Sequence, residues 1–239
     1  MDTAPGRPEI ARLVAANPSP LTLEGTNTYV VGTGPAYVID PGPDDEAHLA
    51  AISGEAERRG GLAGILLTHS HADHAAGAEG LDAPMLWAGG SSDPGPFTAL
   101  PTPGHARDHV CFLLDGACFT GDLILGEGST IVPPDGGSLV AYLESLRSLQ
   151  DLDLDLLCPG HGPFVTDPAA KIAEYLEHRL EREQKLVAAL EGGERSRARL
   201  LDTAWDDVPS ELRWAAAEAM QAHLEKLDAE ARLPGDLHD

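Results

Sequence analysis

Three histidines and one aspartate lie close together in the run Thr68-His69-Ser70-His71-Ala72-Asp73-His74. Neutral imidazole and carboxylate are the ligands that Zn²⁺ and similar ions prefer. His69 and His71 are two residues apart, so they would share one face at the end of a strand. No ordinary structural role explains such a cluster, which therefore predicts a metal site.

Three more candidate ligands follow apolar strands or a tight turn. Asp122 comes after the run 117–121, His161 comes after 154–158, and His105 ends the turn Thr102-Pro103-Gly104-His105. If these strands are parallel neighbours, their carboxyl ends converge on one edge, where loops usually build sites. Seven ligands suit two ions better than one, because a tetrahedral zinc takes four. The predicted set is His69, His71, Asp73, His74, His105, Asp122 and His161.

The order of the predicted elements is that of an α/β protein. A helix is expected at 44–59, where helix-forming residues precede a Gly60-Gly61 stop. Another is expected at 138–150, where the apolar spacing is helical. From Pro168 onward the chain is helical, with a break at Gly192-Gly193. Strands are expected at 28–32, 36–40, 64–68, 109–114, 117–121 and 154–158. The first two are expected to form one hairpin, and 109–114 and 117–121 a second. We predict a catalytic domain over 1–179 and a small helical domain over 180–239.

The chain is strongly acidic, with 239 residues and a net charge of −23. Such a field repels phosphate backbones and anionic membranes. Residues 1–167 carry 6 Lys and Arg against 23 Asp and Glu, a net of −17, and residues 168–239 carry 10 against 16, a net of −6. Neither part has the basic footprint of a nucleic-acid-binding protein, and the segment 195–199 (RSRAR) is the one local basic patch.

The sequence also favours a cytoplasmic location. No apolar run reaches the ~18 residues that a membrane span needs, and residues 1–12 lack the pattern of a secretion signal. Cys111, Cys118 and Cys158 sit in apolar runs without a CxxC pair, which indicates buried free thiols. The last helix carries an apolar stripe that could serve packing within its domain or a homodimer contact.

The motifs THSHADH, TPGH, TGD and PGHG resemble those of the metallo-β-lactamase superfamily, over about residues 20–165. The resemblance implies an αββα sandwich with the site along one edge of its two sheets. Asp40, in the run 38–42, resembles the first motif of the family, an acid that orients histidines of the metal site.

The same resemblance divides the ligands between two zinc ions. One ion would be held by His69, His71 and His105. The other would be held by Asp73, His74 and His161. Asp122 would bridge the two ions.

A closer resemblance is to the β-lactamase-like protein 2 subfamily, through NPSP at 17–20, GTNTY at 25–29 and GDLILGEG at 121–128. It implies a catalytic domain followed by a small winged-helix-like domain, which the helices from Glu181 onward would form. Animal members of the subfamily resemble endoribonucleases of single-stranded RNA, and fungal relatives resemble thioesterases of polyketide chains.

The predicted metal set and the acidic surface favour hydrolysis of an acyl thioester or ester by a hydroxide that bridges two zinc ions, whereas the β-lactamase-like protein 2 resemblance favours action on RNA. Zinc lowers the pKa of bound water from 15.7 to about 7, so hydroxide is available at neutral pH. Asp73 would orient the nucleophile or pass its proton to the leaving group. The alternatives are a single-stranded RNA endoribonuclease and a mononuclear-iron persulfide dioxygenase on the same fold. The complete ligand set disfavours a non-catalytic binding module.

The remaining histidines and one tyrosine are interpreted from their positions. His109 follows His105 by four residues and could line the pocket, act as an acid or make a structural hydrogen bond. Tyr142 is expected in the core because of its helical spacing. Surface positions are expected for His48, His178, His223 and His238, which lie on predicted helices or in the tail.

Overall fold

The computed structural model describes residues 1–88 and 93–238, and the chain folds into two compact units. The first unit is formed by the described residues of 1–102, 108–130 and 152–169. The second is formed by 103–107, 131–151 and the described chain from Ala170. The predicted domain boundary between residues 179 and 180 stays a prediction, and Asp239, at the end of the predicted helical domain, lies outside the described residues.

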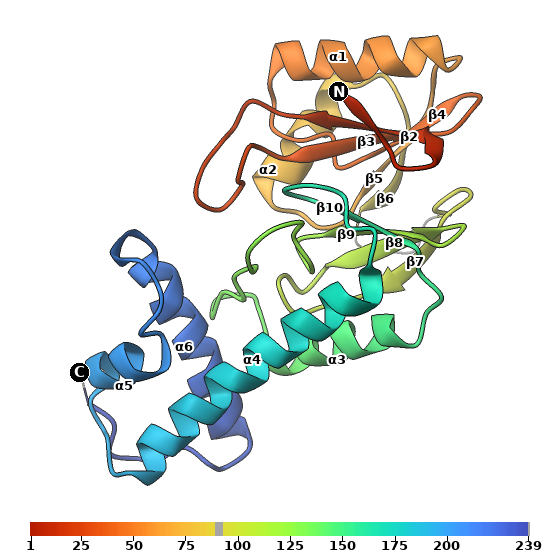
Figure 1. Ribbon diagram of the computed structural model, residues 1–239. Helices are drawn as coiled ribbons and strands as arrows, with labels where there is room; N and C mark the ends of the chain where they lie inside the picture. The colour runs from red at the N-terminus through yellow and green to blue at the C-terminus, as the bar shows by residue number, and fades with distance from the viewer. Residues whose placement is uncertain (89–92, 239) are drawn as a thin grey trace. The chain divides into compact units, whose positions relative to one another are not determined.

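Two sheets make up most of the first unit (Figure 1). The larger sheet has the strand order β1 (Asp2–Ala4), β2 (Arg7–Val14), β3 (Asn27–Val31), β4 (Ala36–Ile39), β5 (Leu62–Leu67) and β6 (Met85–Ala88). The smaller has the order β10 (Leu156–Pro159), β9 (Ala117–Gly121), β8 (Val110–Leu114) and β7 (Thr98–Pro101). Parallel pairs are β4 with β5, β5 with β6, and β9 with β10.

Both predicted hairpins are confirmed. Strands β3 and β4 pair antiparallel, as do β8 and β9. The turn between β8 and β9 has φ of 47° at Asp115 and 84° at Gly116. Two consecutive positive φ angles are what a two-residue hairpin loop requires, because their twist matches that of the strands.

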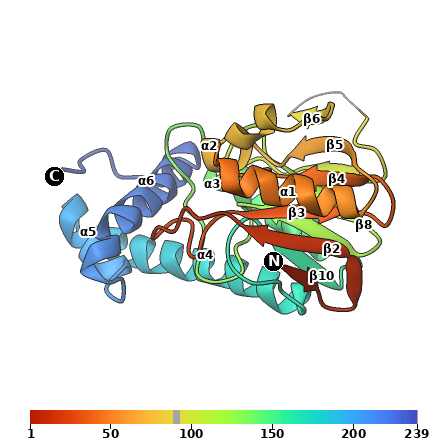
Figure 2. The same cartoon turned by 90° about the horizontal axis from the view of Figure 1, so that it is seen from above.

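Strand β5 is buried on both faces, as its continuous apolar sequence predicts. Leu66 belongs to the core between the two sheets, together with Tyr29 and Phe112. Ile65 faces the other way and packs with Ile52 of helix α1 (Glu46–Arg58). Figure 1 and Figure 2 show α1 lying over the outer face of the larger sheet. The first unit is therefore a layered α/β structure with its main core between the sheets.

The second unit is helical. It contains α3 (Leu139–Gln150), most of α4 (Pro168–Glu191), α5 (Arg197–Ala204), a short 3-10 turn (Ser210–Leu212) and α6 (Arg213–Ala229). Its core is formed by apolar side chains of α4, α5 and α6, including Leu186, Leu200 and Leu224. In the described residues 166–238, β-pairing is limited to one isolated bridge, between Ser196 and His238. The predicted winged-helix-like domain therefore stays a prediction.

Two of the histidines expected at the surface are buried, so that prediction is wrong for His48 and His223. His48 lies on the inner side of α1, where its Nε2 is 2.8 Å from the hydroxyl of Thr28. His223 packs edge-on against Trp205 in the helical core. The hydrogen bond to Thr28 offsets the cost of burying the imidazole of His48. Helical spacing alone reveals neither this bond nor the ring contact of His223.

Other core predictions are confirmed. The three cysteines are buried free thiols, and Tyr142 is fully buried. In the described part of the chain, no helix is long and apolar enough to cross a membrane.

Candidate metal centre

The polar residues predicted as ligands follow strands whose carboxyl ends lie at one edge of the first unit. The parallel register pairs Ile39 with Leu66, so Asp40 and Thr68 emerge next to each other. In the smaller sheet, Pro159 pairs with Gly121, which brings Asp122 beside His161. The expectation of parallel neighbours holds for β9 and β10, whereas β5 belongs to the other sheet.

Backbone hydrogen bonds join the two sheets at this edge. The amide of Val110 donates to the carbonyl of Thr68 at 2.8 Å. The amide of Asn27 donates to the carbonyl of Gly160 at 2.7 Å. The first bond ties the residue after β5 to the start of β8, and the second ties the residue after β10 to the start of β3, so each joins one sheet to the other.

One cluster of ligand atoms surrounds the carboxylate of Asp122. Its Oδ1 lies 3.3 Å from Nε2 of His74 and 3.3 Å from Nε2 of His161. Oδ2 of Asp73 lies 3.4 Å from Nε2 of His161. The ligand atoms of Asp73, His74 and His161 all fall within 4.8 Å of one another, which a single cation could span.

A second cluster lies beside the first. Nε2 of His69 is 3.0 Å from Nδ1 of His71, and ligand atoms of both residues lie within 4.8 Å of one from Asp122. The structure thus brings six of the seven predicted ligands together within the first unit. Asp122 belongs to this cluster and also contacts His74 and His161 of the other, as a bridging ligand would.

His105, the seventh predicted ligand, belongs to the second unit. The turn before it is tight, since a Cβ on Gly104 would come within 2.3 Å of Cα of Tyr142. The imidazole is buried, and its Nδ1 lies 2.7 Å from the carbonyl oxygen of Ile131. That carbonyl accepts a hydrogen bond from Nδ1–H and leaves Nε2 as the ligand atom. The place of His105 in the metal set stays a prediction.

Three of the clustered histidines share one hydrogen-bonding pattern. Nδ1 of His69 lies 3.0 Å from the hydroxyl of Thr68, and Nδ1 of His74 lies 2.9 Å from Oδ2 of Asp40. Nδ1 of His161 is 3.2 Å from the carbonyl oxygen of Gly25. A partner on Nδ1 fixes the ring orientation and leaves Nε2 for an ion, as in known metal sites. His71 differs, because its Nδ1 is the atom that faces the cluster.

The charges of the cluster shift the pKa values of its members in opposite directions. Burial alone would lower the pKa of His161, but the carboxylates of Asp122 and Asp73 raise it to about 9. The pKa of buried His74 is raised in the same way, against its desolvation, by Asp122 and Asp40. Burial would raise the pKa of Asp122, yet the two imidazoles lower it well below its usual range. The cluster is a strongly coupled set of carboxylates and imidazoles.

The residues fit a bound divalent cation. Nε2 of His74 is buried and faces Oδ1 of Asp122 at 3.3 Å without meeting the geometry of a hydrogen bond, while its Nδ1 is held by Asp40. A buried polar atom without a partner is costly unless something occupies its lone pair. Imidazole nitrogens with carboxylate oxygens form a donor set typical of zinc and related metals.

Two further residues, Asp40 and His109, lie beside the clustered histidines. Asp40 is buried, and its Oδ1 accepts a hydrogen bond from the amide of Thr68 at 2.7 Å. His109 is also buried, with its ring 5.2 Å from that of His69 and its Nδ1 2.9 Å from the hydroxyl of Thr102.

Sequence analysis missed the contribution of two residues that carry no ligand atom. Thr68 contacts both Asp40 and His69. Gly160 lies so close to the cluster that a Cβ would fall 2.6 Å from Cε1 of His74. Thr68 lies in the motif THSHADH and Gly160 in PGHG, so their positions next to predicted ligands in the sequence could have pointed to them.

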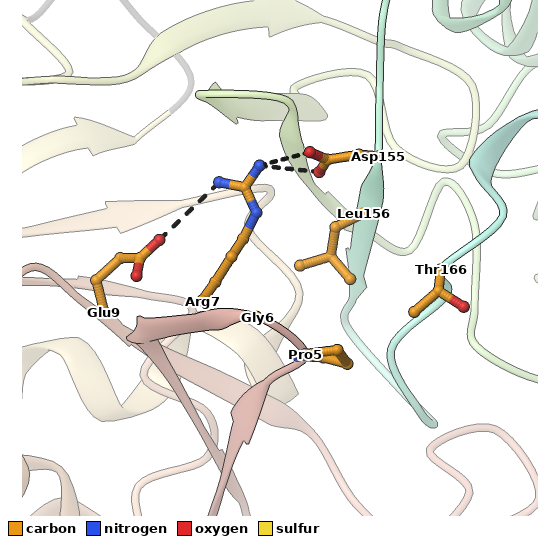
Figure 3. A pocket seen from close by; sticks show the side chains of 7 residues that line it. All are labelled: Pro5, Gly6, Arg7, Glu9, Asp155, Leu156 and Thr166. Carbon is orange, nitrogen blue, oxygen red and sulfur yellow. Dashed lines mark hydrogen bonds and ion pairs between the residues drawn. The ribbon is translucent and has the colours of Figure 1, made fainter.

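A hollow of about 440 Å³ opens at the far ends of the strands, away from the metal cluster (Figure 3). Arg7 crosses it from β2 to Asp155, just before β10, with Nη2 at 2.9 and 2.8 Å from the two carboxylate oxygens. Glu9 lies 3.9 Å from the same guanidinium. One guanidinium thus faces two carboxylates in this hollow, and the contact between Arg7 and Asp155 ties the two sheets together.

Comparison with known proteins assigns the family. The family model described as "Metallo-beta-lactamase superfamily" matches residues 21–83 and 88–161. The chain belongs to the metallo-β-lactamase superfamily. Most enzymes of this superfamily are hydrolytic, and the matched residues include all seven predicted ligands.

Three curated relatives are similar over much of their length. The Lactamase-like protein adaB of Aspergillus niger is 37% identical over 81% of this chain and 67% of its own. The Beta-lactamase-like protein 2 homolog of Drosophila melanogaster is 30% identical over 94% and 89%. The Atrochrysone carboxyl ACP thioesterase of Aspergillus chevalieri is 35% identical over 77% and 66%. The resemblance to β-lactamase-like protein 2 and to lactamase-like thioesterases is thus confirmed.

Solved structures show the same fold. A metallo-beta-lactamase family protein from Thermus thermophilus superposes with a TM-score of 0.73, at 24% identity, over 95% of both chains. A beta-lactamase domain protein from Burkholderia ambifaria gives 0.75 at 18% identity, over 96% of this chain and 88% of that one. The predicted metallo-β-lactamase fold, with its sheets and helices, is confirmed.

Proposed function

We propose that this protein is a dinuclear metal-dependent hydrolase that cleaves acyl thioesters or esters. The observation that carries the proposal is the position of Asp122. Its Oδ1 lies 3.3 Å from Nε2 of both His74 and His161, and it also has a ligand atom within 4.8 Å of those of His69 and His71. A carboxylate between two groups of imidazoles suits a ligand shared by two cations. The name of the thioesterase relative supports the acyl substrate.

In this proposal, one zinc ion is held by His69, His71 and His105. The other is held by Asp73, His74 and His161, and Asp122 bridges them. Two divalent ions in such a site lower the pKa of water and stabilise negative charge on an acyl oxygen.

Asp73 is the residue proposed to move a proton. Burial would raise its pKa, but the hydrogen bond to His161 and the charge of His74 lower it, so the side chain is a carboxylate at neutral pH. It is also the more exposed of the two clustered carboxylates, with 32% of its side chain accessible against 12% for Asp122. These features support the proposed role of Asp73, which is to accept a proton from the attacking water and to pass it to the leaving sulfur or oxygen.

The experiment begins with the metal content of the purified protein, measured by plasma mass spectrometry. We expect two zinc ions per chain. The protein is then offered an acyl N-acetylcysteamine thioester, the matching oxygen ester and an end-labelled single-stranded RNA. We expect thioester hydrolysis that is lost on chelation, restored by zinc and absent in His69→Ala, while Asp153→Asn, an exposed loop change, retains it.

Other outcomes would support the alternatives. Cleavage of RNA that depends on His69 would establish the endoribonuclease, although the net charge of −23 disfavours a phosphate backbone. One iron per chain, with oxygen consumption on a persulfide, would establish the dioxygenase. Undiminished hydrolysis after thorough chelation would overturn the proposed function.

A further inference from the structure

Thr68 is fully buried and lies between Asp40 and the predicted ligand His69. Its hydroxyl is 2.7 Å from Oδ2 of Asp40 and 3.0 Å from Nδ1 of His69. Its backbone amide donates to Oδ1 of the same carboxylate at 2.7 Å. Thr68 therefore occupies both oxygens of Asp40 while also touching a predicted ligand.

The directions of these hydrogen bonds follow from the number of protons available. A carboxylate only accepts, so the single hydroxyl proton of Thr68 is donated to Asp40. The contact with His69 must then run the other way, from Nδ1–H to the hydroxyl oxygen. A neutral imidazole that carries its proton on Nδ1 has a lone pair on Nε2. That atom is the one that faces His71 in the cluster.

The same carboxylate fixes a second ring directly. Nδ1 of His74 lies 2.9 Å from Oδ2 of Asp40, so Nδ1–H donates to it and Nε2 faces Oδ1 of Asp122 in the cluster. His69 and His74 belong to different clusters of ligand atoms. A single acid therefore reaches one histidine of each cluster, His74 directly and His69 through the hydroxyl of Thr68.

Close packing keeps the hydroxyl in this position. Gly121, which precedes Asp122, has a φ of 45°, and a Cβ there would come within 2.4 Å of Oγ1 of Thr68. Glycine at this position leaves room for the hydroxyl between β5 and β9. The close contact with Gly121 and the hydrogen bonds to Asp40 and His69 therefore favour the same orientation of the Thr68 side chain.

We propose that Thr68 is a positioning residue that holds His69 in its Nδ1–H tautomer and links it to Asp40, so that one carboxylate prepares ligands of both ions. The role of preparing metal ligands rests on the proposed dinuclear site. The hydrogen bonds from His69 through Thr68 to Asp40 exist in the metal-free protein and can be tested there.

The test compares Thr68→Val, which removes the hydroxyl and retains the branched shape, with Thr68→Ser, which retains the hydroxyl. The tautomer of His69 is read from the ¹⁵N shifts of the metal-free protein. We expect Nδ1–H in the wild type and in Thr68→Ser, and a mixture containing Nε2–H in Thr68→Val. Thr22→Val is the matched control, because it also loses a buried hydroxyl bond, to the carbonyl of Asn17 at 2.6 Å, without touching a predicted ligand.

The second readout is zinc affinity, measured by competition with a chromophoric chelator. Loss of an outer hydrogen-bond partner costs about 10- to 100-fold in metal affinity. We expect a loss of that size for one of the two ions in Thr68→Val and near-complete rescue in Thr68→Ser.

Three results would overturn the role of Thr68. The first is an Nε2–H tautomer of His69 in the wild type. This measurement does not depend on the folding of any variant. The second is wild-type tautomer and affinity in Thr68→Val, and the third is equal damage in Thr68→Ser. A wild-type protein that bound no metal would instead overturn the proposed function, and the tautomer would still decide the role of Thr68.

Discussion

Oδ2 of Asp40 lies 2.9 Å from Nδ1 of His74, although 34 residues separate them in the chain. Two hydrogen bonds to the backbone of Asp40 hold the residue in position for this contact. Its own backbone carbonyl accepts a hydrogen bond from the hydroxyl of Thr28 at 2.6 Å, and its amide donates to the carbonyl of Leu66 at 3.0 Å. Asp40 has a φ of 51°, a left-handed conformation that aspartate adopts more readily than most residues.

Asp40→Asn should weaken metal binding without changing the size of the side chain. An amide group offers only one acceptor oxygen, so either Thr68 or His74 meets an N–H donor instead. We expect zinc affinity to fall by about 10- to 100-fold, measured by chelator competition at constant pH. Asp44→Asn, an exposed change in the same loop, should bind zinc like the wild type. Equal affinities in the two variants would contradict the orienting role of Asp40.

The ligand cluster was predictable because its members are close in sequence or end apolar strands. The run from His69 to His74 places four ligands on one loop, and the buried sequence of β5 indicates where that loop begins. Residues 117–121 and 154–158 likewise predict the strands before Asp122 and His161, to within two residues of their observed bounds.

What was not predictable depends on pairing between distant segments. Strand β2 carries three charged residues, lacks a regular alternation of apolar residues and contains Pro8, so it becomes a strand through its pairing with β1 and β3. The contact between Asp40 and Thr68 depends on the parallel register of β4 and β5, which no local pattern encodes. Sequence therefore predicted which polar side chains cluster, whereas the contacts of Asp40 and Thr68 with them needed the fold.

Asp122→Asn should change how the stability of the metal-free protein depends on pH. In the wild type the pKa of His161 is raised from 6.5 to about 9, against its burial, chiefly by Asp122. A raised pKa in the folded state contributes stability that is complete below pH 6.5 and lost as the pH rises through 9. Removing the charge of Asp122 lowers that pKa, so most of this dependence should disappear.

The measurement is urea unfolding at pH 6, 7.5 and 9 in the presence of a chelator. Wild type and the control Asp153→Asn should lose stability over this range, and Asp122→Asn should lose much less. An unchanged pH dependence in Asp122→Asn would show that another group holds the proton of His161.

His178→Gln should reduce the acid sensitivity of the helical unit. Burial, followed by the charges of Arg179 and Arg182, lowers the pKa of His178 to about 4. Nε of Arg182 donates to Nε2 of His178 at 3.3 Å, which requires an unprotonated acceptor. A histidine with a lowered pKa contributes stability that is present above pH 6.5 and lost as the pH falls toward 4.

Glutamine retains an acceptor but does not titrate, so His178→Gln should flatten the decline in unfolding free energy between pH 6.5 and 4. Circular dichroism at 222 nm during urea unfolding reports this loss. His238→Gln, in the exposed tail, should decline like the wild type. The same decline in all three proteins would mean that His178 is already protonated in the folded state.

Gly160→Ala should damage the metal cluster through a single added methyl group. The new Cβ would lie 2.6 Å from Cε1 of His74 and 2.7 Å from Oδ1 of Asp122, so at least one ligand must move. Overpacking of this kind costs about 1–3 kcal/mol of stability, and we expect weaker zinc binding with it.

Gly54→Ala is the matched control, because that glycine lies in the interior of α1 with open space around it. Alanine there should raise stability by about 0.5–1 kcal/mol and leave zinc affinity unchanged. Urea unfolding and chelator competition on both variants make the comparison, and wild-type values for Gly160→Ala would show that the loop after β10 does not approach His74 this closely.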